Sequence, residues 1–216
     1  MLVATAYTCR GQGGLLTDAQ DSDAALWLAA SSGTERAFVT IFDRYRSRIF
    51  SAAFRRTNKV SDAEEVVAIV FLEAWKLRKR VRIVDGSVLP WLLAVTANVT
   101  SNLSRSQRRY GRMIARLPLP PEQEDHTPFV DERLDSLPYR KVIDEALKAL
   151  SAGDRAVVEL CLIEELPLAA AAAALDLPVG TVKSRLHRAR KQLQTRLAVA
   201  DLPDDIFTMK TTEEVA

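Results

Sequence analysis

Apolar residues recur three and four positions apart through most of this chain, and that spacing restricts it to helical folds. Runs in which apolar and polar residues alternate, as in a half-buried strand, are hard to find anywhere in it. In the segment 34–56 one apolar stripe consists of Ala37, Phe38, Ile41, Phe42, Tyr45, Ile49, Ala52 and Ala53. The sequence therefore predicts an all-α protein.

An acidic segment rich in proline divides the helical chain into two parts. Five of the nine prolines lie between Pro118 and Pro138, together with six acidic residues and one basic residue, Arg133. Proline stiffens such a segment and like charges extend it, so we expect a linker between two small helical domains. The expected division is a flexible tail at 1–22, a domain at 23–117, the linker at 118–136, a second domain at 137–198 and an acidic tail at 199–216.

In the first part, two further helices follow the 34–56 segment. Ser61 and Glu64 form a capping-box pattern, which predicts that a helix begins at Ser61 and runs to the basic segment 76–82. After a loop at 85–87, Pro90 suits the first turn of a third helix, which ends in a cluster of arginines. These basic helix ends are a candidate footprint for a nucleic-acid backbone.

The second part predicts four helices, at about 139–150, 154–164, 168–175 and 179–197. Only three residues separate the last two, and the earlier of them consists of six alanines between two leucines. Small residues permit close approach, so the pair predicts a helix-turn-helix. At about 100° per residue, the last helix turns Val182, Leu186, Ala189 and Leu193 to the core. The opposite face carries Lys183, Ser184, His187, Arg188 and Lys191, flanked by Arg185 and Arg190, which are donors suited to base edges and phosphates.

Composition and motifs exclude several other classes of protein. The 30 basic and 28 acidic residues leave a net charge of +2, which by itself does not indicate what kind of partner the protein binds. Cys9 and Cys161 form no CxxC pair, and the longest apolar run is about half of the ~20 residues that a membrane span needs. We find no phosphate loop, nucleophile motif or metal-ligand spacing. The sequence predicts a cytoplasmic protein that is not an enzyme, with no cofactor, no metal and no membrane insertion.

With these residues in view, the chain resembles a bacterial RNA polymerase sigma factor of the extracytoplasmic-function group. The segment 61–75 looks like the helix by which the sigma-two domain docks on polymerase, and 91–105 looks like the helix that reads the melted minus-ten element. The segment 175–190 is similar to the sigma-four segment that binds the minus-thirty-five element. The resemblance covers about 37–109 and 142–197.

The resemblance implies a protein that binds core RNA polymerase at its beta-prime clamp helices and beta flap, and that recognises and melts promoter DNA. It also admits an anti-sigma factor as a partner. Residue by residue, it places Lys183, Ser184, Arg185, His187, Arg188 and Lys191 at the minus-thirty-five element. It places Asn98, Asn102, Arg105, Arg108 and Arg109 at the minus-ten element. Polymerase binding is carried over to Asp62, Glu65, Phe71 and Trp75.

The chain departs from the family pattern at two places. Ala68 and Ile69 stand where family members usually carry a Gln-Glu pair, and 169–174 is all alanine where glutamates are usual. Two other functions therefore stay open at this point. One is a stand-alone helix-turn-helix regulator of DNA, and the other is a degenerate sigma relative that acts by protein interaction.

Overall fold

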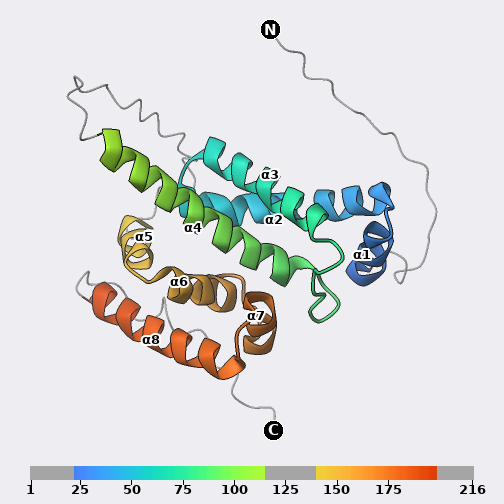
Figure 1. Ribbon diagram of the computed structural model, residues 1–216. Helices are drawn as coiled ribbons and strands as arrows, with labels where there is room; N and C mark the ends of the chain where they lie inside the picture. Colours follow the sequence, from blue (N-terminus) through green and yellow to red (C-terminus); the bar gives the residue numbers. More distant parts are fainter. Residues whose placement is uncertain (1–21, 115–139, 199–216) are drawn as a thin grey trace.

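The computed structural model describes residues 22–114 and 140–198, and these are helical throughout apart from short connections (Figure 1). No strand forms within these two ranges; one isolated bridge joins Val84 and Ser87. The all-α prediction is confirmed. The helices are α1 (Asp23–Ser31), α2 (Glu35–Thr57), α3 (Val60–Lys76), α4 (Leu89–Ile114), α5 (Arg140–Lys148), α6 (Ala152–Val158), η1 (Glu159–Ile163), α7 (Leu168–Leu175) and α8 (Val179–Ala198). The predicted linker, the predicted C-terminal tail and residues 1–21 of the predicted N-terminal tail lie outside the described residues, whereas Ser22 is the N-cap of α1.

Helices α1 to α4 pack together as the N-terminal half, with α2 in contact with each of the other three. Ile41 and Ile49 of α2 are fully buried, as are Val66 of α3 and Leu92 of α4. An aromatic cluster joins α2 to α3, where Phe42 lies 4.7 Å from Phe71 and Phe38 lies 5.0 Å from Trp75 between ring centroids. These edge-on contacts are the arrangement that aromatic rings prefer. Burial of the apolar stripes thus fixes the orientation of α3 and α4.

The start of α3 differs from the prediction. The helix begins at Val60 with Lys59 in the N-cap position, and no side chain caps it. Asn58, in the left-handed conformation, ends α2 only two residues before α3 begins, and the amide of Ala63 donates to the carbonyl of Lys59. Ser61 therefore lies inside the first turn, and the predicted capping box is wrong.

The C-terminal half contains the predicted helix-turn-helix. Helix α7 ends at Leu175, Asp176 takes the left-handed conformation, and α8 begins at Val179. The amide of Leu177 donates to the carbonyl of Ala172, which closes the end of α7. Ala170, Ala171 and Ala172 are buried, so the small side chains do allow α7 to approach its neighbours closely.

The two halves lie directly against each other, which the sequence did not predict. Helix α4 contacts α6, η1 and α7, and Figure 1 shows α4 lying between α2 and α3 on one side and the C-terminal helices on the other. The predicted helix at 154–164 is in fact α6 followed by η1, a turn of π-helix. Such turns are rare and are frequently found at functional sites.

Candidate nucleic-acid interface

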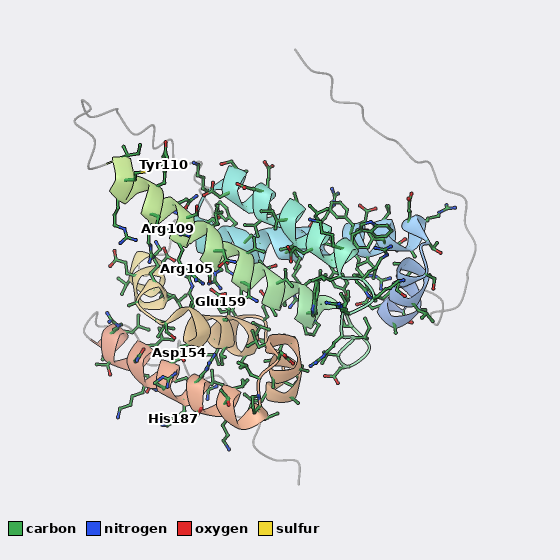
Figure 2. The ribbon with its side chains drawn as sticks, in the orientation of Figure 1. Arg105, Arg109, Tyr110, Asp154, Glu159 and His187 are labelled. Atoms are coloured by element: carbon green, nitrogen blue, oxygen red, sulfur yellow. The ribbon has the colours of Figure 1, made fainter. Side chains whose placement is uncertain are left out.

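Helix α8 separates an apolar face from a basic face. Val182, Leu186, Ala189 and Leu193 are all buried, as predicted. The exposed residues of the other face are Lys183, Ser184, His187, Arg188 and Lys191. Figure 2 shows His187 on the side of α8 that points away from α4. A helix that follows a tight turn and presents donors to solvent in this way has the form that enters a DNA major groove.

Two arginines of α8 also contact α6. The guanidinium of Arg188 donates to both carboxylate oxygens of Asp154, at 2.6 and 3.3 Å. Burial alone would raise the pKa of Asp154. The hydrogen bonds from Arg188 and Ser151 outweigh that effect, so the pKa of Asp154 is below its usual value. The side chain of Arg185 crosses over Gly153, where a Cβ atom would lie 2.7 Å from it. Sequence reasoning missed Asp154, although Ser151 three residues earlier is a capping signal for it.

On α4, four of the five residues predicted for the minus-ten element lie on one exposed stripe. Asn98, Asn102, Arg105 and Arg109 are spaced four, three and four residues apart, so they follow one line along the helix. Arg108 is exposed on the neighbouring line, which also contains Ser101. No acidic residue occurs in α4, which makes this end of the N-terminal half strongly basic.

The four predicted polymerase contacts on α3 divide into surface and core. Glu65 is exposed, and Asp62 is half-buried and accepts a hydrogen bond from Gln107 at 2.8 Å. Phe71 is buried, and Trp75 is half-buried beneath the guanidinium of Arg78, 4.3 Å from its ring. Phe71 and Trp75 therefore support the surface of α3 from below. Beside Glu65, the outer face carries Ala68, Ile69 and the exposed Leu72.

Within 22–114 and 140–198 we find no group of three or more His, Cys, Asp or Glu side chains that could hold a metal ion. Burial raises the pKa of the Cys161 thiol to about 11, so it stays protonated at neutral pH. The cavity between the halves holds about 10 Å³, which is no more than one water molecule. None of the described helices has both the length and the hydropathy needed to cross a membrane.

Comparison with known proteins decides the family. The model of sigma-70 region 2 matches residues 41–110, and that of sigma-70 region 4 matches residues 140–193. The ECF RNA polymerase sigma factor SigL of Mycobacterium tuberculosis is 30% identical over 158 residues, which span 73% of this chain and 86% of SigL. The chain belongs to the extracytoplasmic-function sigma factors. It is thus an alternative sigma factor that directs transcription initiation.

Other relatives of this sigma factor agree. SigW of Bacillus subtilis is 26% identical over 181 residues, which span 76% of the chain and 91% of SigW. SigE of Mycolicibacterium smegmatis is 30% identical over 159 residues, which are 72% of the chain but only 59% of SigE. The solved structure of CnrH in complex with the cytosolic domain of CnrY is 26% identical, with a TM-score of 0.59, and covers 83% of the chain and 99% of CnrH. RpoE of Bartonella quintana, solved in complex with the anti-sigma factor NepR, shares the fold at 24% identity and a TM-score of 0.51.

Proposed function

We propose that this sigma factor recognises promoters through two separate surfaces. The basic face of α8 reads the minus-thirty-five element as duplex DNA in the major groove. The stripe on α4 contacts the melted minus-ten element, where amide and guanidinium groups meet unpaired bases and phosphates. The observation that carries the proposal is the α8 face, because five polar or basic residues are exposed on one side of a helix whose four opposite residues are buried.

The outer face of α3 docks on core RNA polymerase. Asp62 and Glu65 supply charge at one end of this face, and Ala68, Ile69 and Leu72 supply apolar contact beside them. Polymerase then performs the chemistry of RNA synthesis, and the sigma factor acts in the cytoplasm without catalysis of its own. CnrH was solved with the cytosolic domain of CnrY, which supports a second protein partner here as well. We assign that role to an anti-sigma factor.

A titration against sigma-free core polymerase tests the docking surface. The wild-type chain is compared with Ala68→Gln/Ile69→Glu, which restores the family pattern, and with Glu65→Arg, which reverses an exposed charge. We expect tight binding by the wild-type chain and the double variant, and weaker binding by Glu65→Arg. If only the double variant bound, the protein would be a degenerate or partner-dependent relative. If neither the wild-type chain nor the double variant bound polymerase, a stand-alone regulator of DNA would be favoured.

Transcription by the polymerase complex tests the DNA-reading face of α8. Promoters are first selected from a randomised library, and His187→Ala and Lys191→Ala are then assayed on the selected DNA. If the replaced side chain contacts a base edge, each substitution is expected to weaken promoter recognition by about 1–3 kcal/mol. Promoter-dependent transcription should fall accordingly. Gln192→Ala is the matched control, since Gln192 is exposed at the flank of the same helix. Equal effects of all three substitutions would contradict the assigned face.

A further inference from the structure

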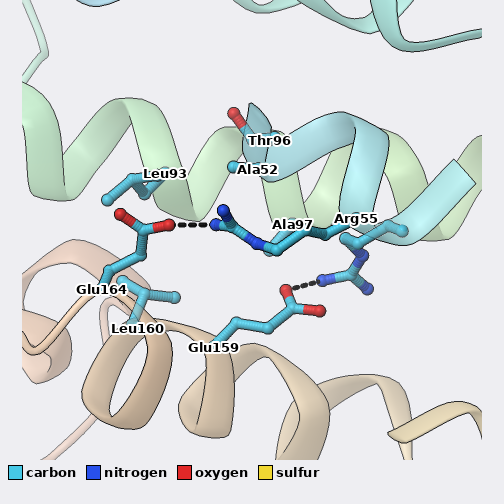
Figure 3. Close-up of a pocket in the computed structure, with 9 residues that line it drawn as sticks. Ala52, Arg55, Leu93, Thr96, Ala97, Glu159, Leu160 and Glu164 are labelled. Atoms are coloured by element: carbon cyan, nitrogen blue, oxygen red, sulfur yellow. Dashed lines mark hydrogen bonds and ion pairs between the residues drawn. The ribbon is translucent and has the colours of Figure 1, made fainter. Parts of the chain in front are cut away.

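Three arginines on one side of α2 meet two glutamates of the C-terminal half. Arg48 donates to Glu164 at 2.9 Å, Arg55 forms an ion pair with the same carboxylate, and Arg56 forms one with Glu159. The cavity between the halves lies at this contact, and Figure 3 shows both glutamates reaching toward α2. We call Arg48, Arg55 and Arg56 the arginine cluster. It is the main charged contact between the two halves.

The π-turn η1 explains how one short segment presents both glutamates. The amide of Glu164 donates to the carbonyl of Glu159 at 2.9 Å, so the two residues are the ends of a single i to i+5 turn. Residues five apart in an α-helix would point about 140° away from each other. The π-turn instead places both carboxylates toward α2. This rare local structure therefore serves the contact with the arginine cluster.

The contact removes charge from water on both sides. The side chain of Glu164 is 6% exposed, and so is that of Arg56. Burial lowers the pKa of the Arg56 guanidinium, and the charge of Glu159 opposes that change. Arg56 also donates to Ser101 of α4 at 2.9 Å, so the cluster adjoins the helix that carries the minus-ten stripe. Separation of the halves would leave all three arginines next to that helix without these carboxylate partners.

The proposed function requires such a separation. Elements centred near positions minus ten and minus thirty-five are about 25 base pairs apart, or about 85 Å along duplex DNA at 3.4 Å per base pair. A compact chain of roughly 150 residues has a radius of gyration of only about 15 Å. The two DNA-reading surfaces therefore do not reach both elements of straight DNA while the halves are packed together.

We propose that the arginine cluster is a binding site for the phosphate backbone of promoter DNA, and that Glu159 and Glu164 occupy it in the closed chain. The glutamates act as an internal substitute for phosphate, because carboxylates and phosphates accept the same charge-assisted hydrogen bonds from arginine. This inference rests on the proposed function. It adds a third DNA contact, on α2, and it predicts that the closed chain binds DNA more weakly than an open chain does.

Neutralising the glutamates tests the proposal on the full-length chain without polymerase. In Glu159→Gln/Glu164→Gln the arginine cluster loses its counter-charges but the side chains keep their shape. Small-angle scattering is expected to show a larger radius of gyration. Affinity for duplex DNA of arbitrary sequence should rise about tenfold. Each added phosphate contact steepens the dependence of log affinity on log salt by about 0.9, so the slope should steepen by about 2 to 3.

Two further variants complete the experiment. Glu35→Gln/Glu145→Gln removes two exposed carboxylates elsewhere, so it changes net charge equally and should leave scattering and the slope at wild-type values. Adding Arg48→Ala/Arg55→Ala to Glu159→Gln/Glu164→Gln should abolish the gain in DNA affinity. Arg56 is left unchanged because its side chain is buried. A variant that stays compact would overturn the closing role of the glutamates, and an open variant with wild-type DNA affinity would overturn the phosphate site. Failure of polymerase binding would instead contradict only the proposed function.

Discussion

Asp23 is a buried carboxylate that accepts hydrogen bonds from two other parts of the N-terminal half. The donors are Arg44 at 2.6 Å, Tyr45, Ser87 at 2.8 Å and the amide of Val88 at 3.0 Å. Burial alone would raise the pKa of Asp23, but the hydrogen bonds from these donors outweigh that effect, so its pKa lies below the ordinary value for an aspartate. The ionised form therefore ties α1 to α2 and to the loop before α4.

We expect Asp23→Asn to reduce the free energy of unfolding by about 2 kcal/mol at pH 7, because a charged acceptor is lost and donors stay buried. The folded pKa is depressed, so the stabilisation is present above about pH 4 and disappears as pH falls through the folded value. Denaturant titrations of both proteins at pH 7 and pH 3 check this. Asp43→Asn, at an exposed carboxylate, should change stability by less than about 0.5 kcal/mol.

Arg188 has two roles that one substitution would combine. Arg188→Ala is expected to weaken promoter recognition by about 1–3 kcal/mol, and also to destabilise the C-terminal half, because it leaves the buried Asp154 without its charged partner. His187→Ala should affect transcription alone. Transcription and thermal unfolding are therefore measured on both variants. Wild-type transcription by a folded Arg188→Ala protein would contradict the predicted register of α8.

At the scale of elements, the apolar spacing was enough to predict the helices other than α1, where no helix was expected, and η1. It gave the residues 168–175 of α7 as the structure has them and started α8 at the correct residue. It did not predict the π-turn η1, because a five-residue hydrogen-bonded turn leaves no distinct apolar period and depends here on ion pairs with α2. The predicted start of α3 was wrong for a related reason. The short connection at Asn58, rather than a capping side chain, determines where α3 begins.

The alanines of α7 allow a prediction at the same scale. Ala171 is fully buried where α7 meets its neighbours, whereas Ala169 is exposed. Ala171→Leu should destabilise the protein by about 1–3 kcal/mol through overpacking, and it should weaken minus-thirty-five recognition by displacing α7 from α8. Ala169→Leu adds the same atoms at the surface and should be tolerated. Thermal unfolding and promoter binding of the two variants distinguish packing from helix propensity, which is equal for both.

For the whole molecule, the sequence indicated two halves and a linker but not that the halves pack together. Composition separates the segments, whereas the contact depends on which faces of α2 and α4 remain uncovered after each half has folded. The relevant residues, such as Glu164 and Arg55, look like ordinary surface charges in the sequence. Only the three-dimensional structure shows that they form ion pairs 109 positions apart.

The packing of the halves predicts salt-dependent cooperativity. All three tryptophans lie in the N-terminal half, so their fluorescence reports on that half, while far-ultraviolet circular dichroism reports on both. At low salt the ion pairs couple the halves, and the two unfolding curves should coincide. At 1 M salt the Debye length is about 3 Å, which weakens the partly exposed pairs of Arg48 and Arg55, and the curves should separate. Separate curves at low salt would mean that the contact does not couple the halves.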